Sequence, residues 1–228
     1  MSSPNSSDAV VIAAAGYLSA QTGEAQWHVG DRGVSSDGQP GHDDRSLGAA
    51  GMLTISEGRG VAWVDFRYSR PFATYPRGRL AAAELILDAQ IGLRAVDTGR
   101  IRCDLLGGVR IVNVRASVLP AAEPGHAGAL DSGNTWGNGV VGIRAGVGLA
   151  SGVWLNGQAD VGGQFPDSLG SNFTWQASGG AEWRAGAAYA LVLDYRVLAL
   201  SHHVSNVHSE TTRHALFAGV RYTVRRGP

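Results

Sequence analysis

Polar and apolar side chains alternate along the segment from residue 153 to residue 184, with one break at 166–170. The polar phase includes Asn156, Gln158, Asp160, Thr174, Gln176 and Glu182, and the apolar phase includes Val153, Leu155, Val161, Phe173, Trp175 and Trp183. Successive side chains leave a β-strand on opposite faces, so a period of two predicts extended strands. Each of these strands therefore has one apolar face and one polar face.

The same alternation recurs along most of the chain and predicts ten strands. Their approximate ranges are 9–20, 47–56, 60–70, 79–96, 100–118, 136–149, 153–165, 171–184, 188–203 and 211–224. Short links at 57–59, 97–99, 150–152 and 185–187 alternate with longer ones at about 21–46, 71–78, 119–135, 166–170 and 204–210. Such alternation is typical of transmembrane barrels, which have short turns at one end and long loops at the other. Eight or twelve strands are alternatives, because the first two strands alternate poorly.

Charged residues on the polar faces balance one another. Seven are acids (Asp65, Glu84, Asp88, Asp104, Asp160, Glu182 and Asp194) and seven are arginines (Arg67, Arg94, Arg110, Arg144, Arg184, Arg196 and Arg221). The chain contains no lysine, and arginine is the better partner for enclosed carboxylates because its planar fork binds them in bidentate fashion. We therefore predict a narrow, charge-lined lumen, either plugged by ion pairs or passing small ions or solutes. Neutralising Arg110 or Arg144 is expected to destabilise the barrel more than it changes conductance.

Composition bounds the remaining choices. The 228 residues suit one all-β domain, the formal net charge of zero gives no electrostatic case for nucleic acid, and no apolar run is long enough for a spanning helix. The predicted fold class is a single closed antiparallel up-and-down transmembrane β-barrel over 9–224. Residues 1–8 are expected to form a disordered segment and residues 225–228 a tail. No secretory signal is visible before the first predicted strand.

Several motifs resemble those of a widespread group of small Gram-negative outer-membrane β-barrel proteins of the OmpA-like transmembrane type. They are Asp104-Leu105-Leu106-Gly107-Gly108-Val109-Arg110, Val141-Gly142-Ile143-Arg144, Asp160-Val161-Gly162-Gly163, Thr174-Trp175-Gln176 and Asp194-Tyr195-Arg196. The resemblance implies a monomer in the outer membrane, in contact with the lipid bilayer and lipopolysaccharide. Gly219-x-x-Tyr222-x-Val224 is similar to the signal read by the barrel assembly machinery. Members of the group are mostly functionally undefined, so the resemblance supplies no activity.

An enzymatic alternative comes from the segment His203-Val204-Ser205-Asn206, which resembles the motif of lipid A 3-O-deacylases. Residues i and i+2 of a strand share a face, so His203 is placed to act as general base for Ser205. That family's acid lies on the following strand, where this chain has none, and Glu210 in the preceding loop is the substitute. A soluble ligand-binding barrel is a further alternative. The principal prediction is a non-enzymatic protein without cofactor. No metal site is predicted, because the histidines show no regular ligand spacing.

Aromatic residues near the predicted strand ends are expected to lie at the membrane interfaces. These are Trp63, Trp175, Trp183, Tyr68, Tyr195 and Tyr222.

Overall fold

The computed structural model describes residues 9–29, 32–36, 45–70, 72–75, 78–120, 130–150, 152–164, 172–204 and 207–225. Within this part of the chain the regular elements are strands, and no helix in it is long and apolar enough to cross a membrane. The strands are β1 (Ala9–Val29), β2 (Arg32–Ser36), β3 (Arg45–Glu57), β4 (Gly60–Ser69), β5 (Phe72–Tyr75), β6 (Gly78–Asp97), β7 (Ile101–Pro120), β8 (Leu130–Ala150), β9 (Val153–Gly163), β10 (Asn172–Arg184), β11 (Tyr189–Val204) and β12 (Val207–Arg225).

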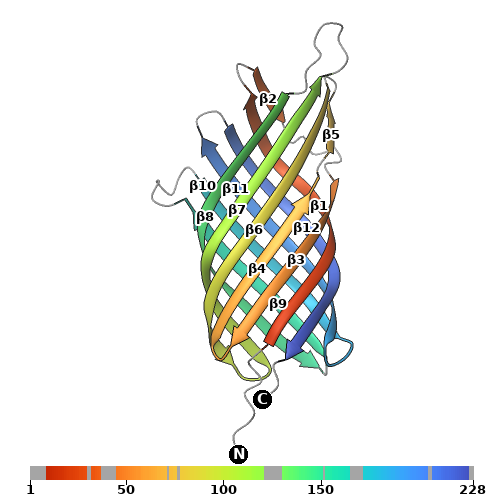
Figure 1. The fold of residues 1–228 in the computed structure, drawn as a ribbon, viewed down its shortest axis with the longest axis vertical. Coiled ribbons are helices and arrows are strands. Elements are labelled where there is room, and N and C mark those ends of the chain that lie inside the picture. Colours follow the sequence, from red (N-terminus) through yellow and green to blue (C-terminus); the bar gives the residue numbers. More distant parts are fainter. Residues whose placement is uncertain are drawn as a thin grey trace, which may run out of the picture.

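Ten of these strands close into an antiparallel barrel, as Figure 1 shows. Each pairs with its sequence neighbour, and β12 returns to β1 in a register that runs from Ala9 opposite Arg225 to Trp27 opposite Val207. The two remaining strands extend the barrel wall at one end, where β2 pairs with the end of β1 and β5 with the start of β6. The prediction of ten barrel strands is confirmed.

The short connections lie at one end of the barrel, which we call the short-turn end, together with the start of β1 and the finish of β12 (Figure 1). Gly58, Gly99 and Gly152 each adopt a positive φ there (55°, 78° and 85°), a conformation that glycine accepts without steric cost. The longer connections lie at the opposite end. This arrangement agrees with the alternation of short and long links in the sequence.

Several hairpins are longer than the side-chain pattern predicts. β1 continues to Val29, β8 begins at Leu130 and β12 begins at Val207, so parts of the expected links 21–46, 119–135 and 204–210 are paired strand. Alternation marks only the part of a strand that has one apolar and one polar environment. Backbone pairing continues beyond that zone without leaving the same signal, because water can solvate both faces there.

The outer surface of the barrel is apolar. Leu47 and Ile91 are 75% and 72% exposed, and they belong to a belt that covers every side of the wall. Other members of the belt are Leu93, Leu105, Val109, Val141, Leu155, Val161, Trp183, Leu191, Leu193, Leu216 and Val220. A soluble ligand-binding barrel requires the reverse arrangement, with an apolar interior and a polar surface. The exposed belt instead fits the hydrocarbon core of a bilayer.

Among the aromatic residues expected at the membrane interfaces, Trp63 is an exception, because it lies inside the barrel. Trp175, Trp183, Tyr195 and Tyr222 are exposed on the outer surface. Trp63 is only 2% exposed, because it shares the inward phase of β4 with Asp65 and Arg67. The orientation of Trp63 therefore follows its position in the polar phase of the alternation and not its aromatic side chain.

Glycine allows two neighbouring strands to approach closely at the barrel wall. A Cβ added to Gly108 of β7 would lie 2.1 Å from the carbonyl oxygen of Ala89 and 2.6 Å from the Cα of Gln90, both on β6. Backbone atoms cannot move aside as a flexible side chain does, so this position accepts only glycine. Gly107 next to it faces the other way, and the closest atom to its added Cβ would be 3.8 Å away.

Candidate functional site in the barrel interior

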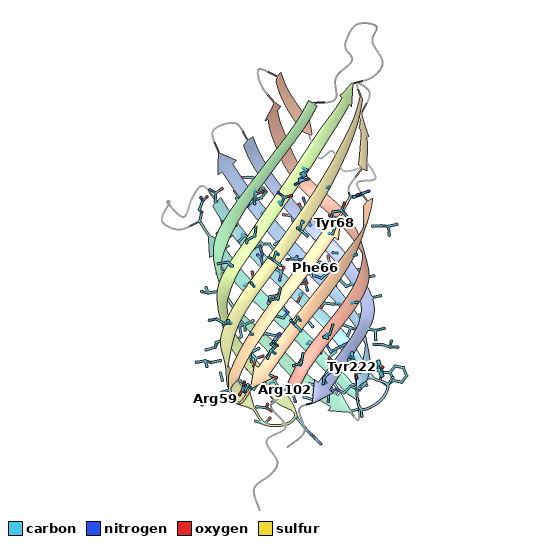
Figure 2. The ribbon with its side chains drawn as sticks, in the orientation of Figure 1. Arg59, Phe66, Tyr68, Arg102 and Tyr222 are labelled. Carbon is cyan, nitrogen blue, oxygen red and sulfur yellow. The ribbon has the colours of Figure 1, made fainter. Side chains whose placement is uncertain are left out.

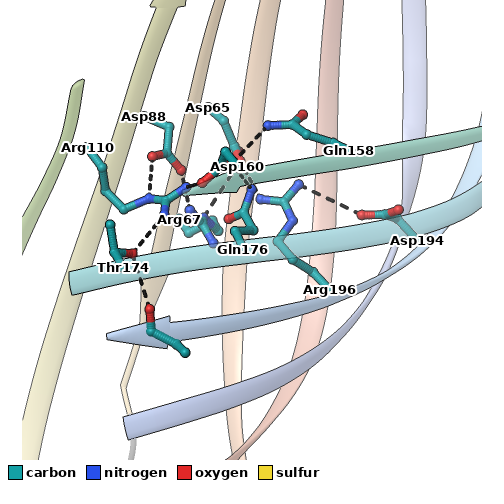
Figure 3. Close-up of polar contacts among 11 residues, drawn as sticks. Asp65, Arg67, Asp88, Arg110, Gln158, Asp160, Thr174, Gln176, Asp194 and Arg196 are labelled. Atoms are coloured by element: carbon teal, nitrogen blue, oxygen red, sulfur yellow. Dashed lines mark hydrogen bonds and ion pairs between the residues drawn. The ribbon is translucent and has the colours of Figure 1, made fainter. Parts of the chain in front are cut away.

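Arg110 of β7 is the centre of a polar network in the middle of the barrel (Figure 3). Its side chain is fully buried, and its Nε donates to Asp88 Oδ1 at 2.6 Å. Its two terminal nitrogens donate to Asp160 Oδ1 at 2.8 Å and to Thr174 Oγ1 at 2.9 Å. These partners come from β6, β9 and β10. Because β7 is not adjacent to β9 or β10 in the sheet, the contacts cross the interior.

Neutral side chains complete the surroundings of Asp160. Gln158 and Gln176 each donate to its Oδ2 at 3.3 Å, and all three side chains belong to the inward phase of β9 and β10. The Thr174 hydroxyl, which accepts from Arg110, also donates to the carbonyl oxygen of Ala199 on β11. The network therefore ties five strands together through side chains as well as through the sheet.

A second part of the network joins opposite walls. Arg67 of β4 pairs with Asp88 and lies 3.6 Å from Asp65. Arg196 of β11 also pairs with Asp65, and lies 3.8 Å from Asp194. Three strands, β3, β1 and β12, separate β4 from β11 by the shorter way round the barrel, so the bond between Arg196 and Asp65 spans its interior.

Six of the seven remaining predicted charges form two groups nearer the short-turn end, and the seventh is Glu84. Asp104 accepts from Arg94 at 3.0 Å and from Arg144 at 2.9 Å. Glu182 accepts from Arg184 at 3.2 Å, and it also pairs with Arg221. In each group one carboxylate serves two guanidinium groups. The structure thus places all fourteen charged residues of the polar phase inside the barrel and brings every one of them into an ion pair.

Sequence reasoning missed two charged interior residues: Arg102 of β7, which lies 3.7 Å from Asp97, and Arg213 of β12, which pairs with Glu84 of β6 across the interior. A signal for Arg213 was present, because it lies eight residues before Arg221 and so shares its phase. Extending the same phase through Phe217 and Ala215 identifies Arg213 as an inward residue.

The interior also contains an apolar layer that the sequence analysis did not anticipate. Ile86 of β6, Val112 and Val114 of β7, and Leu198 and Leu200 of β11 form one buried cluster, and Val112 has no exposed surface. Strands β6 and β7 meet β11 only through the interior, so this cluster crosses it. β7 and β11 both begin at the short-turn end, and Val112 and Leu198 come two residues after Arg110 and Arg196 along them. The apolar layer therefore lies further from the short-turn end than these two arginines. The expectation of a purely Arg/Asp/Glu-lined lumen is therefore incomplete.

Below the network, a cavity of about 500 Å³ occupies the half of the barrel nearer the short-turn end. We call this cavity the vestibule. It reaches from turn residues 186–188 up to Asp65 and Arg196. Small side chains of β1 and β3 leave the space, because Ala13, Ala15 and Ala50 line one wall.

The structure gives no geometry for the hydrolase alternative. Ser205, Asn206 and the side chain of His203 lie outside the described residues. Glu210 is described and exposed, and its backbone lies opposite Ser201 in β11. The convergence of His203, Ser205 and Glu210 remains a prediction.

Solved structures with the same architecture are outer-membrane proteins. Over 98% of this chain and 99% of the other, the fold superposes on the outer membrane protease OmpT from Escherichia coli with a TM-score of 0.57 and 13% identity. The translocator domain of autotransporter NalP from Neisseria meningitidis has a TM-score of 0.49, 14% identity and coverage of 96% and 89%. Neisserial surface protein A has a TM-score of 0.44 and 14% identity, over 94% of this chain and 96% of the other.

No family model matches the chain, and no curated protein matches it. At such identities the structural likeness establishes the fold and leaves activity open. The chain has the fold of the small Gram-negative outer-membrane β-barrels.

Proposed function

We propose that this chain is a non-enzymatic integral outer-membrane protein whose interior is closed to solutes and ions. The exposed apolar belt supports the membrane assignment, since a surface of this kind is stable against lipid and not against water. The outer membrane follows from the fold, because the solved structures of this architecture reported above belong to outer-membrane proteins.

The single observation that carries the proposal is the fully buried side chain of Arg110, bound to Asp88, Asp160 and Thr174. A guanidinium group held at three points by three strands lies in the interior without exposed surface and obstructs the path of a solute. Opening a path requires breaking charge-assisted hydrogen bonds, each worth about 1.5–3 kcal/mol. The polar network therefore acts first as a structural plug.

The apolar layer above the network adds a second barrier. Ile86, Val112 and Leu198 pack together with almost no exposed surface. Apolar constrictions exclude ions by remaining dry, so a layer of this kind opposes conduction even where space exists. Two barriers of different chemistry in series support a closed barrel better than either alone.

The use of the charges supports a non-enzymatic role. Interior carboxylates such as Asp88, Asp104 and Glu182 are each engaged by two arginines, which leaves them poorly placed as general bases. A protein anchored in this way can act through its outer loops, by contact with lipopolysaccharide or with other partners.

Vesicle permeability and a lipid A assay test the two parts of the proposal. Vesicles that contain the refolded protein are expected to take up arabinose no faster than protein-free vesicles. It is also expected to release no acyl chain from lipopolysaccharide, in wild type as in Ser205→Ala. Sugar uptake that rises with protein content would overturn the closed interior. Acyl release that Ser205→Ala abolishes would establish the hydrolase instead.

A further inference from the structure

The vestibule contains more positive than negative charge. Its lining includes six arginines (Arg94, Arg102, Arg144, Arg184, Arg196 and Arg221) and four acids (Asp65, Asp104, Glu182 and Asp194). Asp97 contacts Arg94 and Arg102 at the edge of the cavity. When Asp97 is included, six arginines still outnumber five acids. Around Arg110, by contrast, two arginines meet two aspartates. The excess is confined to the vestibule.

Arg102 carries most of this excess. It belongs to the inward phase of β7, and Figure 2 shows it at the short-turn end of the barrel. The acid in contact with it is Asp97, with Nε and Oδ2 3.7 Å apart, beyond hydrogen-bond distance. Its buried Nε has no hydrogen-bond partner. A guanidinium group with one buried, unused donor in a partly enclosed site favours an anion beside it.

A second arginine lies close to the same place. The guanidinium carbons of Arg102 and Arg184 lie 5.0 Å and 4.9 Å from the centre of the Trp154 ring. Cation–π contacts hold both groups near one aromatic side chain, and so hold two like charges near each other. Arg184 shares its carboxylate, Glu182, with Arg221. An anion bound here would relieve the repulsion between the two guanidinium groups.

The opposite wall of the vestibule is uncharged and largely apolar. In the strand register, Ala13 and Ala15 of β1 lie opposite Met52 and Ala50 of β3, and all four line the cavity together with Thr54 and Ser56. The three alanines leave room beside the arginines. The site therefore combines guanidinium groups on one side with an uncharged apolar surface on the other, which is the pattern of a small-molecule pocket with a few polar anchors.

We propose that the vestibule binds a small organic anion, with its carboxylate among Arg102 and Arg184 and its apolar body against the β1–β3 wall. The vestibule lies on the short-turn side of the Arg110 network, so a ligand reaches it without crossing the barrel. Binding is therefore independent of whether the interior conducts. An inorganic anion lacks the apolar body, and a neutral analogue lacks the charge.

Calorimetry on the protein in lipid nanodiscs, with benzoate as the probe, tests the proposal. Benzoate is expected to bind saturably, and inorganic phosphate and benzyl alcohol at least about tenfold more weakly. The double variant Arg102→Gln/Arg184→Gln is expected to weaken benzoate binding by about tenfold or more, because it removes the charged donors. Ala13→Leu, which narrows the apolar side without altering charge, is expected to weaken it as well. Arg115→Gln, an exposed arginine on the same strand β7, is the matched control and leaves binding unchanged.

Three outcomes would overturn the proposal. The first is no saturable benzoate binding to wild-type protein, and the second is binding of phosphate or benzyl alcohol as tight as that of benzoate. The third is benzoate binding that neither the double variant nor Ala13→Leu reduces. Gel mobility with and without boiling confirms that each variant is folded, and Ala13→Leu keeps the test decisive if the double variant does not fold. A permeable barrel in the vesicle assay would leave these outcomes unaffected.

Discussion

Replacing Arg110 with methionine is expected to destabilise the barrel by about 3 kcal/mol. The change keeps most of the side-chain volume and removes three hydrogen bonds. Removing one partner of a buried ion pair costs about 3–5 kcal/mol, mostly because the other charge is left uncompensated. Here Asp88 keeps Arg67, and Asp160 keeps Gln158 and Gln176 as neutral donors. The expected cost therefore lies at the lower end of that range.

A second substitution separates lost charge compensation from lost packing. In Arg110→Met/Asp160→Asn the uncompensated carboxylate is gone, so we expect the double variant to regain about 1–2 kcal/mol over Arg110→Met alone. Asp160→Asn in the wild-type background is expected to destabilise, because it weakens the bond to Arg110. Two substitutions that each destabilise alone but partly compensate together are the signature of a coupled pair.

The assay is urea unfolding of the protein in lipid vesicles, followed by tryptophan fluorescence and by the loss of the fast-migrating band on unboiled gels. Arg115→Met is the matched control, since Arg115 is an exposed arginine of the same strand, and it is expected to change the free energy of unfolding by less than about 0.5 kcal/mol. The reasoning fails if Arg110→Met unfolds with a free energy within about 0.5 kcal/mol of wild type. It also fails if Asp160→Asn brings no recovery.

Three further predictions test other parts of the account. Leu198→Ala in the apolar layer is expected to cost about 2–5 kcal/mol in urea unfolding, whereas the lipid-facing Leu193→Ala costs less because it leaves no buried cavity; equal effects of the two would count against the layer. Gly108→Ala is expected to destabilise by about 1–3 kcal/mol and Gly107→Ala to leave stability near wild type, and similar unfolding of both variants would refute the close approach at Gly108. Brominated lipids quench the tryptophans that face lipid, so the quenched fraction of the total fluorescence is expected to be smaller in Trp183→Phe than in wild type. In Trp63→Phe this fraction is not expected to fall, and a fall would place Trp63 outside the barrel.

The period-two pattern predicted most of the fold because each barrel strand has two unlike environments. Inward residues such as Asp160 and Gln176 and outward ones such as Val161 and Trp175 differ in kind, and the pattern records that difference. Strand ends beyond the apolar belt have no such contrast. For this reason the extension of β1 to Val29 and the pairing of β2 and β5 were not predicted.

Which inward residues meet across the barrel was beyond the reach of the sequence. Alternation assigns Arg196 and Asp65 to one interior but contains no information about contacts between strands 131 residues apart. Leu198 and Leu200 share the phase of Arg196, and that phase places them inward although they are apolar. Phase was the more reliable guide, because the backbone fixes it whatever the side chain.

The central claim is that ion pairs and an apolar layer close the interior of a membrane-spanning barrel. Current across planar bilayers containing the refolded wild-type protein tests it most directly. The account predicts no stable single-channel steps for wild-type protein in 1 M KCl. Regular steps from the wild-type protein would contradict a closed interior.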